Sequence, residues 1–251
     1  MLLAGIHTVA LPLATSIVNL ASILRILSDG APHLKESFRS SHMPTHQKKT
    51  FIAVAGNIGS GKSSLTTLLG KHFGWKPYFE SVEDNPYLAD FYGDMKRWSF
   101  HLQIYFLSHR FINHKQIVES PDPVIQDRSI YEDAEIFARN LHEIGNMDDR
   151  DYTNYVALYH VMMEYLQPPD LMIYLRASVD TLKKQISKRG RTYEQSIKRE
   201  YLEQLNHHYE SWISSYKLGP LLVIESDGLD FVHNEKDFQY VEKLVREKIG
   251  V

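Results

Sequence analysis

A glycine-rich loop between an apolar run and an amphipathic one is the feature that most constrains how this chain folds. The loop GNIGSGKSS, residues 56–64, fits the pattern G-x-x-x-x-G-K-[ST] and follows the apolar run FIAVA. Glycines let backbone N–H groups close around phosphate oxygens, and the N-terminus of the following helix adds partial positive charge. Lys62 would reach the outer phosphates, and the Ser63 hydroxyl would bind Mg²⁺. We therefore expect a strand–loop–helix unit that binds a nucleoside triphosphate.

Short apolar runs alternate with longer amphipathic runs over the rest of the chain. We predict strands at residues 50–56, 76–81, 122–127, 169–178 and 219–226. We predict helices at residues 60–74, 97–110, 131–145, 151–166, 179–187, 196–216 and 237–249. Strands that alternate with helices predict an α/β fold, in which helices cover both faces of a parallel sheet.

Composition limits the class of protein. With 251 residues, 43% of them hydrophobic, the chain can form one sizeable core and carry a tail. The net charge of −3 gives no reason to expect a nucleic-acid polymer as a partner. No cysteine is present, which excludes disulfides, thiolate chemistry and zinc sites built on cysteine. This composition is compatible with a cytoplasmic location, which we expect.

The N-terminal segment differs from the rest, and we expect residues 1–48 to be a disordered or apolar helical extension of a domain at 49–251. Residues 1–27 are apolar, with no acidic residue and one arginine, Arg25. A signal peptide would have positive charge before the apolar run, and polar residues within the run weaken a membrane anchor. We favour translation from Met43, which would leave the preceding segment out of the native protein. We expect no membrane contact for the domain itself.

An acidic residue at the end of a neighbouring strand would complete the phosphate site. The run VIQDRS supplies Asp127 there, with Arg128 beside it. Asp127 would hold Mg²⁺, directly or through water, and Arg128 would contact the transferring phosphoryl group. The alternative is an ordinary turn in which Arg128 pairs with a nearby acid. Because a phosphate loop precedes this strand, we favour the functional interpretation.

A basic break between two late helices has the features of a lid. In KRGRTYE, residues 188–194, Arg189 and Arg191 flank a glycine that permits a bend. Such a segment would close its arginines over the phosphates, and a solvated basic turn is the alternative.

A phosphate loop with a lid needs a second substrate. Glu80 lies at the end of the short strand predicted at residues 76–81, at the edge where such sheets bind ligands, so it is either a base for an attacking hydroxyl or a structural acid.

The helix RWSFHLQIYFLSHR, residues 97–110, carries polar side chains in an apolar setting. Gln103 and Arg110 lie on the same face, and burying them is costly unless a partner pairs with them. Gln103 presents a donor and an acceptor that match the edge of adenine or cytosine, and a turned amide serves guanine. Arg110 needs an acid, which Asp133 offers, and Phe137 one turn further would stack on a base. A polar network between helices, without a ligand, is the alternative.

Taken together, these residues resemble the deoxynucleoside kinase family, which contains deoxycytidine, deoxyguanosine, deoxyadenosine and mitochondrial thymidine kinases. The resemblance runs from about residue 51 to the C-terminus. It is carried by five motifs in combination: GNIGSGKSS, FESVEDNPYL, FYGDMKRWSFHLQ, DRSIYED and KRGRTYEQ. The fold that it implies is a P-loop kinase with a five-stranded parallel sheet flanked by helices and an arginine-bearing lid. Members are commonly dimers through a helix pair, so a homodimer is expected.

The resemblance also implies which residues bind the acceptor. The substrate-binding set is Glu80, Val82, Tyr92, Gln103, Arg110, Arg128, Asp133, Phe137 and Glu194. Within this set, Glu80 would be the base that acts on the sugar 5′-hydroxyl. Tyr92 and Glu194 would hold the sugar 3′-hydroxyl.

The donor side follows in the same way from the resemblance. The ATP-binding set is Gly56, Asn57, Ile58, Gly59, Ser60, Gly61, Lys62, Ser63, Ser64, Arg189, Arg191, Asp230 and Phe231. Its last two residues belong to SDGLDFV, which falls where the family holds the donor's adenine. The catalytic set is Glu80, Arg128, Lys62 and Asp127, and the metal ligands for Mg²⁺ are Ser63 and Asp127.

Two positions depart from the family pattern. Mammalian members have a glutamate where this chain has Asp127, so the shorter acid changes the reach toward magnesium. Gln185 stands where some relatives have an arginine that contacts the donor, which bears on the choice of donor.

The predicted reaction transfers the γ-phosphate of ATP to the 5′-hydroxyl of a deoxynucleoside. The run ESVEDNPYL followed by FY resembles bacterial enzymes for purine deoxynucleosides, so we expect deoxyadenosine or deoxyguanosine, with deoxycytidine left open. A nucleoside monophosphate kinase of the thymidylate kinase type is one alternative, and it would need cations to grip the acceptor's phosphate. A catalytically silent assembly subunit is the other, against which the intact Lys62 and Asp127 argue.

Overall fold

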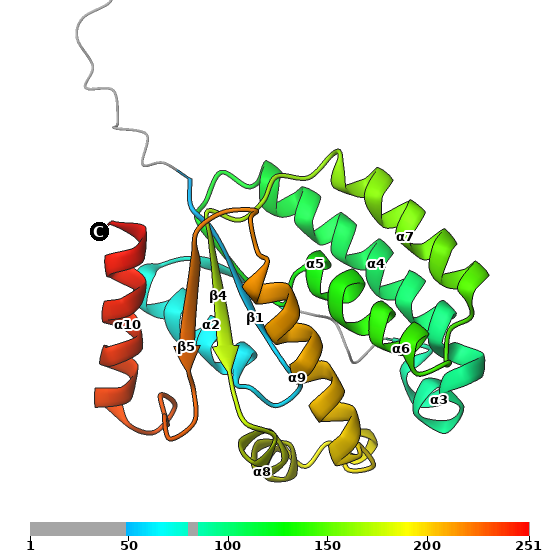
Figure 1. The fold of residues 1–251 in the computed structure, drawn as a ribbon. Coiled ribbons are helices and arrows are strands. Elements are labelled where there is room, and N and C mark those ends of the chain that lie inside the picture. The colour runs from blue at the N-terminus through cyan, green and yellow to red at the C-terminus, as the bar shows by residue number, and fades with distance from the viewer. Residues whose placement is uncertain (1–48, 80–84, 251) are drawn as a thin grey trace, which may run out of the picture. The chain divides into compact units, whose positions relative to one another are not determined.

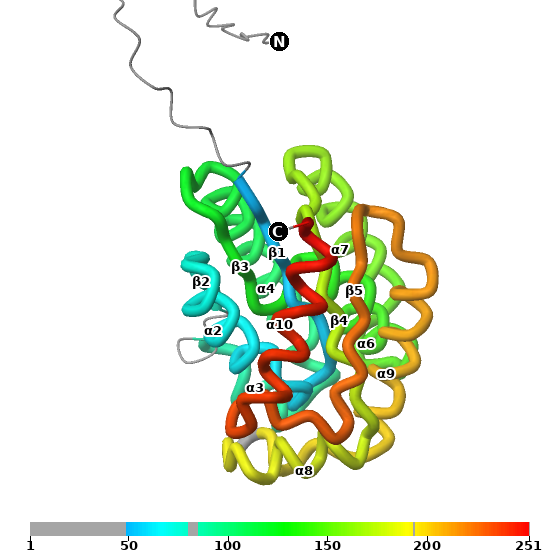
Figure 2. The backbone as a smooth tube through the Cα atoms, turned by 90° about the vertical axis from the view of Figure 1, so that its left-hand side faces the viewer, coloured from blue at the N-terminus to red at the C-terminus, as the bar shows by residue number. Residues whose placement is uncertain are grey.

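A five-stranded parallel sheet forms the centre of the fold. The computed structural model describes residues 49–79 and 85–250. The strands are β1 (Phe51–Gly56), β2 (Lys76–Tyr78), β3 (Val124–Asp127), β4 (Leu171–Arg176) and β5 (Leu221–Glu225). They lie in the order β2-β3-β1-β4-β5, and every neighbouring pair is parallel (Figures 1 and 2). The α/β class and the five parallel strands predicted from the sequence are confirmed.

Helices connect the strands and cover the sheet. They are α2 (Lys62–Phe73), α3 (Leu88–Gly93), α4 (Met95–Glu119), α5 (Ile130–Glu132), α6 (Arg139–Glu143), α7 (Asp149–Met163), α8 (Val179–Arg189), α9 (Arg199–Ser214) and α10 (Glu235–Ile249). A π-helical turn, η1 (Asp133–Ala138), joins α5 to α6, and a 3₁₀ turn, η2 (Thr192–Glu194), follows α8. The helix predicted over residues 131–145 is therefore a helical run with a π-helical middle. Helix α3 was not predicted.

Alternate side chains of a strand point to opposite faces of the sheet, which divides the core into two layers. In β1, Phe51, Ala53 and Ala55 pack into one hydrophobic cluster, and the intervening Ile52 and Val54 pack into another. All six residues of β1 are buried. Near-continuous apolar strands of this kind are typical of a parallel sheet that is covered on both faces.

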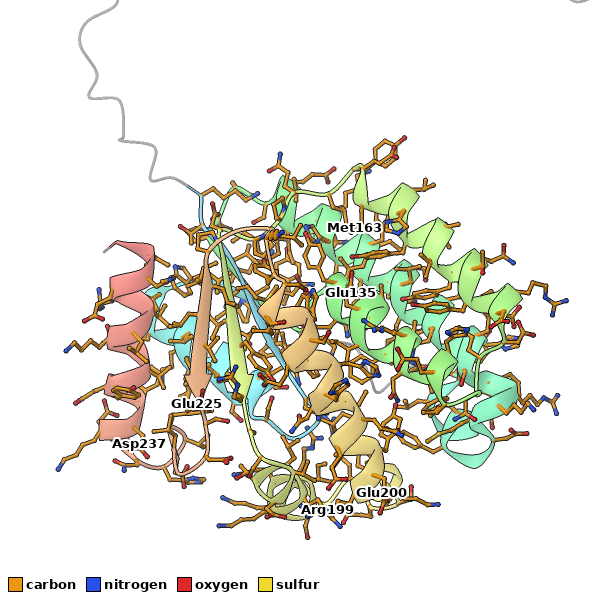
Figure 3. The ribbon with its side chains drawn as sticks, viewed as in Figure 1. Glu135, Met163, Arg199, Glu200, Glu225 and Asp237 are labelled. Atoms are coloured by element: carbon orange, nitrogen blue, oxygen red, sulfur yellow. The ribbon has the colours of Figure 1, made fainter. Side chains whose placement is uncertain are left out.

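Each core layer belongs to a different set of helices. Helices α2 and α10 supply the second cluster and lie in front of the strands in Figure 2. Helices α4, α7 and α9, with η1, supply the first cluster on the opposite face. Figure 3 shows side chains filling the space between the sheet and these helices, whereas the exposed Arg199 and Glu200 point outward at the start of α9.

The sheet places two functional segments side by side. Val54 pairs in register with Asp127, so the loop that follows β1 and the turn that follows β3 leave the same edge. The strands of Figure 1 point toward α8, which brings the segment after α8 to that edge as well. Ligands of open α/β sheets bind at this edge.

Two predictions concern a membrane: one is about the domain itself, and the other is about the N-terminal segment. No helix within residues 49–79 and 85–250 is long and apolar enough to cross a bilayer. Residues 1–48 lie outside the described residues, so the interpretations of that segment and the domain boundary at residue 49 stay predictions.

A buried histidine links the stability of the fold to pH. His114 of α4 is fully buried, its Nε2 lies 2.7 Å from the carbonyl oxygen of Gln167, and its ring packs edge-on against Phe51. Burial lowers the pKa of His114, and the hydrogen bond to Gln167 opposes that effect. The unfolded chain therefore takes up the proton at a higher pH than the folded chain does.

We expect the protein to lose stability as the pH falls below about 6.5, because protonation of His114 then favours the unfolded state. Thermal unfolding measured from pH 7 to pH 5 checks this. His114→Gln should flatten the pH dependence of Tm, whereas His109→Gln, at an exposed position of the same helix, should leave it unchanged. An equal slope in the two variants would contradict the assignment.

Candidate active site

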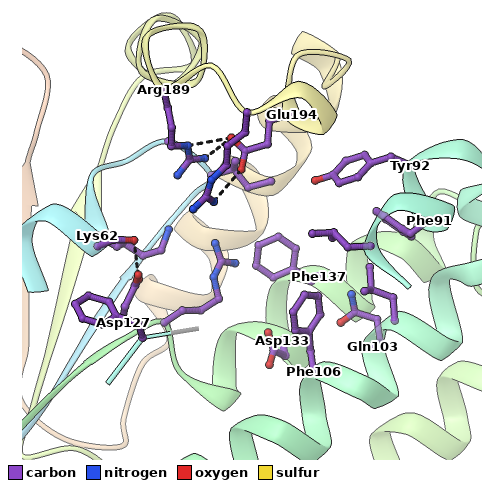
Figure 4. A pocket seen from close by; sticks show the side chains of 18 of the residues that line it. Lys62, Phe91, Tyr92, Gln103, Phe106, Asp127, Asp133, Phe137, Arg189 and Glu194 are labelled. Atoms are coloured by element: carbon purple, nitrogen blue, oxygen red, sulfur yellow. Dashed lines mark hydrogen bonds and ion pairs between the residues drawn. The ribbon is translucent and has the colours of Figure 1, made fainter. Parts of the chain in front are cut away.

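A cavity of about 300 Å³ opens at the carboxyl edge of the sheet. One end is lined by the phosphate loop, by the residues after β3 and by the lid, which we define as residues 189–194. The other end is lined by α3, α4 and η1. Figure 4 shows Lys62, Asp127 and Arg189 at the first end and Gln103 at the second. The volume is at the lower end of the range for small-molecule sites, about 300–1,000 Å³.

The phosphate loop adopts a conformation that requires its glycines. Gly59 has a φ of 85°, and a Cβ there would lie 2.9 Å from the carbonyl oxygen of Leu182. Gly61 has a φ of 94° and immediately precedes Lys62, the first residue of α2. Lys62 Nζ donates to the carbonyl oxygen of Asn57 at 2.9 Å, across the loop. The strand–loop–helix unit predicted from the sequence is confirmed.

Asn57 anchors this loop to α9. Its Nδ2 donates to the carbonyl oxygen of Leu202 at 3.0 Å and to Asn206 Oδ1 at 2.7 Å. Its Oδ1 accepts from the backbone N–H of Ile58 at 2.7 Å. The side chain of this predicted ATP-binding residue thus holds the loop in place, while Ile58 lines the cavity.

The two predicted metal ligands lie in contact. The Ser63 hydroxyl donates to Asp127 Oδ2, and both residues line the cavity. Asp127 Oδ1 is buried and has no hydrogen-bond partner within the described ranges. A hydroxyl beside a carboxylate oxygen fits Mg²⁺, which takes oxygen ligands and is usually held by one or two carboxylates together with substrate phosphates.

Arg128 has the most constrained backbone at the site. With a φ of 63°, it is the only non-glycine residue with a positive φ in the part of the chain that the structure describes. Such a conformation costs about 1 kcal/mol and persists where the surroundings fix it. The Arg128 N–H donates to the carbonyl oxygen of Val54 at 2.9 Å, and its carbonyl accepts from Arg110 Nη1 at 3.1 Å. The guanidinium lies over the Phe137 ring, 4.3 Å from the centroid.

The lid arginines are held by an acid. Helix α8 ends at Arg189, and Gly190, with a φ of 71°, turns the chain toward η2. Glu194 is buried, accepts from Arg189 Nε at 3.0 Å through Oε2, and lies 3.4 Å from Arg191 Nη1 through Oε1. All three side chains line the cavity, and Figure 4 shows the contacts of Glu194. The break predicted at residues 188–191 is confirmed, with its arginines turned to the cavity.

The far end of the cavity offers an apolar slot with one polar group. Gln103 of α4 is only 3% exposed, and its Oε1 has no hydrogen-bond partner among the described residues. The rings of Phe106 and Phe137 and the side chain of Tyr92 line the same space (Figure 4). A buried amide oxygen without a partner is costly, so it points to a ligand with a hydrogen-bond donor.

Arg110 and Asp133 form the buried ion pair predicted from the sequence. The Nε of Arg110 contacts Asp133 Oδ2, and both side chains are nearly inaccessible to solvent. Asp133 lines the cavity, whereas Arg110 lies behind it and does not. Arg110 therefore acts on the slot through Asp133 and through the carbonyl of Arg128.

The π-helical turn brings two of these side chains together. Asp133 and Phe137 both belong to η1 and both line the cavity. The turn begins directly after Glu132, which forms a capping box with Ser129. Such turns are rare and are frequent at functional sites, so its presence here supports the location of the site.

A second, smaller cavity of about 70 Å³ lies on the other side of the phosphate loop. Ser60, Gly61, Ser64, Gln185, Asp230 and Phe231 are among its lining residues. The Phe231 ring packs so close that a Cβ on Gly61 would lie 3.0 Å from it. Asp230 is exposed and pairs with His233 at 2.9 Å, and that hydrogen bond lowers the pKa of Asp230. The predicted adenine segment and Gln185 thus share one cavity.

Two predicted residues lie outside the described residues, and some residues that line the cavity were not predicted. Glu80 and Val82 lie outside the described residues, so their roles stay predictions. Tyr201 of α9 and Phe91 of α3 line the cavity and were missed. Burial raises the pKa of Tyr201 to about 12, and the charge of Arg128 opposes that shift. An aromatic residue in an amphipathic helix carries no sequence signal that distinguishes a cavity wall from the core.

We expect Asp133→Asn to destabilise the fold by about 3–5 kcal/mol, because it leaves the guanidinium of Arg110 buried without its acid. Urea unfolding measures this free energy. Glu143→Gln is the matched control, because it removes the acid from the exposed pair Arg139–Glu143 and should cost less than about 1 kcal/mol. Equal costs for the two variants would contradict the buried pair.

Known proteins resemble this chain over most of its length. Residues 52–250 match the family described as deoxynucleoside kinase. A deoxyadenosine/deoxycytidine kinase of Bacillus subtilis is 41% identical over 205 residues, which cover 81% of this chain and 93% of that protein. A deoxyguanosine kinase of Lactobacillus acidophilus is 41% identical over 209 residues, with 80% and 91% covered.

A solved structure agrees with the fold. The deoxyadenosine kinase of M. mycoides, solved with the products dCMP and dCDP, superposes with a TM-score of 0.71 at 33% sequence identity. The match covers 79% of this chain and all of that one. The sheet, the phosphate loop and the two-ended cavity agree with what these comparisons indicate: the chain belongs to the deoxynucleoside kinase family and is an ATP-dependent nucleoside kinase.

Proposed function

We propose that this kinase transfers the γ-phosphoryl group of ATP to the 5′-hydroxyl of deoxyadenosine or deoxyguanosine, with deoxycytidine as a further acceptor. The observation that carries this proposal is the Oε1 of Gln103, buried and without a partner among the described residues, in an aromatic slot that opens toward the phosphate loop. The similar kinases from Bacillus subtilis and Lactobacillus acidophilus, which act on deoxyadenosine, deoxycytidine or deoxyguanosine, support the choice of bases.

The acceptor would bind with its base in the slot. The Gln103 amide offers an acceptor and two donors, which suit the edge of adenine, or of cytosine, in one orientation and that of guanine in the other. The rings of Phe106 and Phe137 line the slot and would cover the base. The sugar would then lie between Tyr92 and Glu194, and its 5′-hydroxyl would face the phosphate loop.

The donor would bind across the phosphate loop. The N–H groups of residues 57–63 and the N-terminus of α2 suit the β- and γ-phosphates, and Lys62 would exchange the carbonyl of Asn57 for a phosphate oxygen. When bound at Ser63 and Asp127, Mg²⁺ would neutralise charge on the phosphate oxygens. Arg128 lies between the two ends of the cavity and would stabilise charge on the transferring group.

The lid would change partners when both substrates bind. Glu194 holds Arg189 and Arg191 in this structure. A sugar hydroxyl that donates to Glu194 would compete with those contacts, and the arginines would then turn to the donor phosphates. Through this exchange the lid would close over both substrates and keep water from the phosphoryl group.

The two alternatives fit the site less well. Among the described lining residues, the lysines and arginines are Lys62, Arg189 and Arg191 at the donor end and Arg128 between the two ends. A monophosphate kinase would also need cations beside the acceptor's phosphate. A silent assembly subunit would have no need for Lys62, Ser63 and Asp127 arranged around one cavity.

With Mg-ATP and the full chain, we expect dAMP or dGMP to form at least about tenfold faster than dTMP under equal concentrations of nucleoside. Lys62→Met should lower kcat by about 100- to 1,000-fold, because it removes a cation that stabilises transferred charge. Lys71→Met, at the exposed end of the same helix, should be neutral. Product analysis by chromatography measures both effects. A preference for thymidine, or ATP binding without turnover of any nucleoside, would count against the proposal.

We also propose that the protein is a homodimer through α4 and α7 and that it is located in the cytoplasm. The two helices pack side by side and carry Ile112, Leu158 and Val161, with Tyr165 just beyond α7. These side chains are 39–73% exposed. Large apolar side chains gathered on one helix pair are typical of a self-association surface.

Light scattering after size exclusion should therefore give twice the chain mass for the wild type. Val161→Glu combined with Tyr165→Glu should give a monomer, because two charges would be buried at the contact. Tyr240→Glu places the same charge on an exposed aromatic of α10 and should leave the dimer intact. A wild-type monomer at micromolar concentration would refute the proposed dimer.

A further inference from the structure

A fully buried carboxylate links the two halves of the phosphate site. The side chain of Glu132 in α5 has no solvent exposure. Its Oε1 accepts from the backbone N–H of Gly56 at 3.1 Å and from the Tyr209 hydroxyl at 2.7 Å. Its Oε2 accepts from the Ser129 backbone N–H at 2.8 Å and from the Ser129 hydroxyl at 3.2 Å. Four hydrogen-bond donors thus surround one carboxylate, and they stabilise its negative charge.

These donors come from three separate segments. Gly56 ends β1 and begins the phosphate loop, and Ser129 follows Arg128 directly. Tyr209 belongs to α9, the helix that follows the lid. Sequence separations of 76 and 77 residues to Gly56 and Tyr209 show that this side chain joins distant parts of the chain. Glu132 itself does not line the cavity.

One consequence concerns the strained turn at Arg128. The peptide group before Arg128 is held by its own N–H, which donates to Val54. The peptide group after Arg128 is held at its carbonyl by Arg110 and at its nitrogen, the Ser129 N–H, by Glu132. The positive φ of Arg128 is thus fixed from both sides, and Glu132 supplies one of these restraints.

The other consequence concerns the phosphate loop. Gly56 has no room for a side chain, since a Cβ there would lie 2.6 Å from Ser60 Oγ. Its N–H donates to Glu132 and its carbonyl lies 2.8 Å from the Tyr209 hydroxyl. That hydroxyl has a single proton, which the neighbouring carboxylate attracts. Burial and then the charge of Glu132 raise the pKa of Tyr209, so the hydroxyl stays protonated.

We propose that Glu132 is a positioning residue for phosphoryl transfer: one carboxylate holds the start of the phosphate loop and the backbone of Arg128 at a fixed separation. This inference rests on the proposed function, in which both segments contact the transferring phosphoryl group. Glu132 acts through Gly56 and Ser129 and touches neither substrate. It sets the geometry in which the nucleophile and the phosphoryl group meet.

Glu132→Gln is the sharpest test because it keeps the shape and replaces one oxygen with a donor. Hydroxyl groups can turn to accept from the new NH₂ group, but the N–H of Gly56 or of Ser129 cannot, so one segment must shift. We expect kcat to fall about 100-fold, as for a displacement on the order of 1 Å at a reacting centre. The KM for the nucleoside should stay within about threefold, since Gln103 and its slot are untouched.

Tyr174→Phe is the matched control. The Tyr174 ring is buried and stacks on Tyr209 with centroids 5.6 Å apart, and its hydroxyl donates to Glu210 rather than to Glu132. This variant should lower Tm without changing kcat. A folded Glu132→Gln that loses thermal stability but keeps kcat within about twofold of wild type would overturn the proposal.

Two further measurements keep the outcomes distinct. If Glu132→Gln does not fold, Tyr209→Phe serves as the test, because it removes only one of the four donors to Glu132. A fall in kcat of about tenfold at constant nucleoside KM supports the proposal, and an unchanged kcat contradicts it. If wild type binds ATP yet phosphorylates no nucleoside, the proposed function fails. The positioning role is then judged on the ATP dissociation constant by calorimetry, which Glu132→Gln should raise about tenfold and a merely structural residue would leave unchanged.

Discussion

A parallel strand that is buried on both faces is the constraint on which the rest of this structure depends. Strand β1 lies between β3 and β4, and every one of its residues is buried. It ends at Gly56, where a Cβ would lie 2.9 Å from the carbonyl oxygen of Leu175, so only glycine fits where the chain enters the phosphate loop. Because all strands are parallel, the end of β3 and the chain that leads to the lid reach the same edge. The parallel sheet thus brings together the segments that form the site.

The charged groups of the site fall into two kinds. Arg110 with Asp133, and Glu132 with its four donors, are buried away from solvent and hold the scaffold. The contacts of Lys62 with Asn57, and of Glu194 with the lid arginines, lie on the cavity wall, and we propose that substrate groups replace them. A kinase of this design needs both kinds, because catalysis by positioning requires a rigid frame and a cavity wall that rearranges on binding.

Sequence analysis could predict the features that depend on local pattern. The strand–loop–helix unit, the buried polar face of the helix at residues 97–110 and the pair of Arg110 with Asp133 follow from motif and helical periodicity, and the structure confirms them. The coupling of Glu132 to Gly56 could not be predicted, since it joins residues 76 positions apart. Tyr201 was missed because helical periodicity does not separate a cavity wall from the core. The π-helical turn at Asp133–Ala138 has no recognised sequence signal either.

The most direct test of the account is a crystal structure of the full chain with deoxyadenosine and a non-hydrolysable ATP analogue. We expect adenine against the rings of Phe106 and Phe137 with its edge on the Gln103 amide. We also expect the analogue's phosphates to bind residues 56–64 and Glu194 to be released from Arg189. A base bound elsewhere, or a Gln103 amide that remains without a partner when the nucleoside is bound, would contradict it.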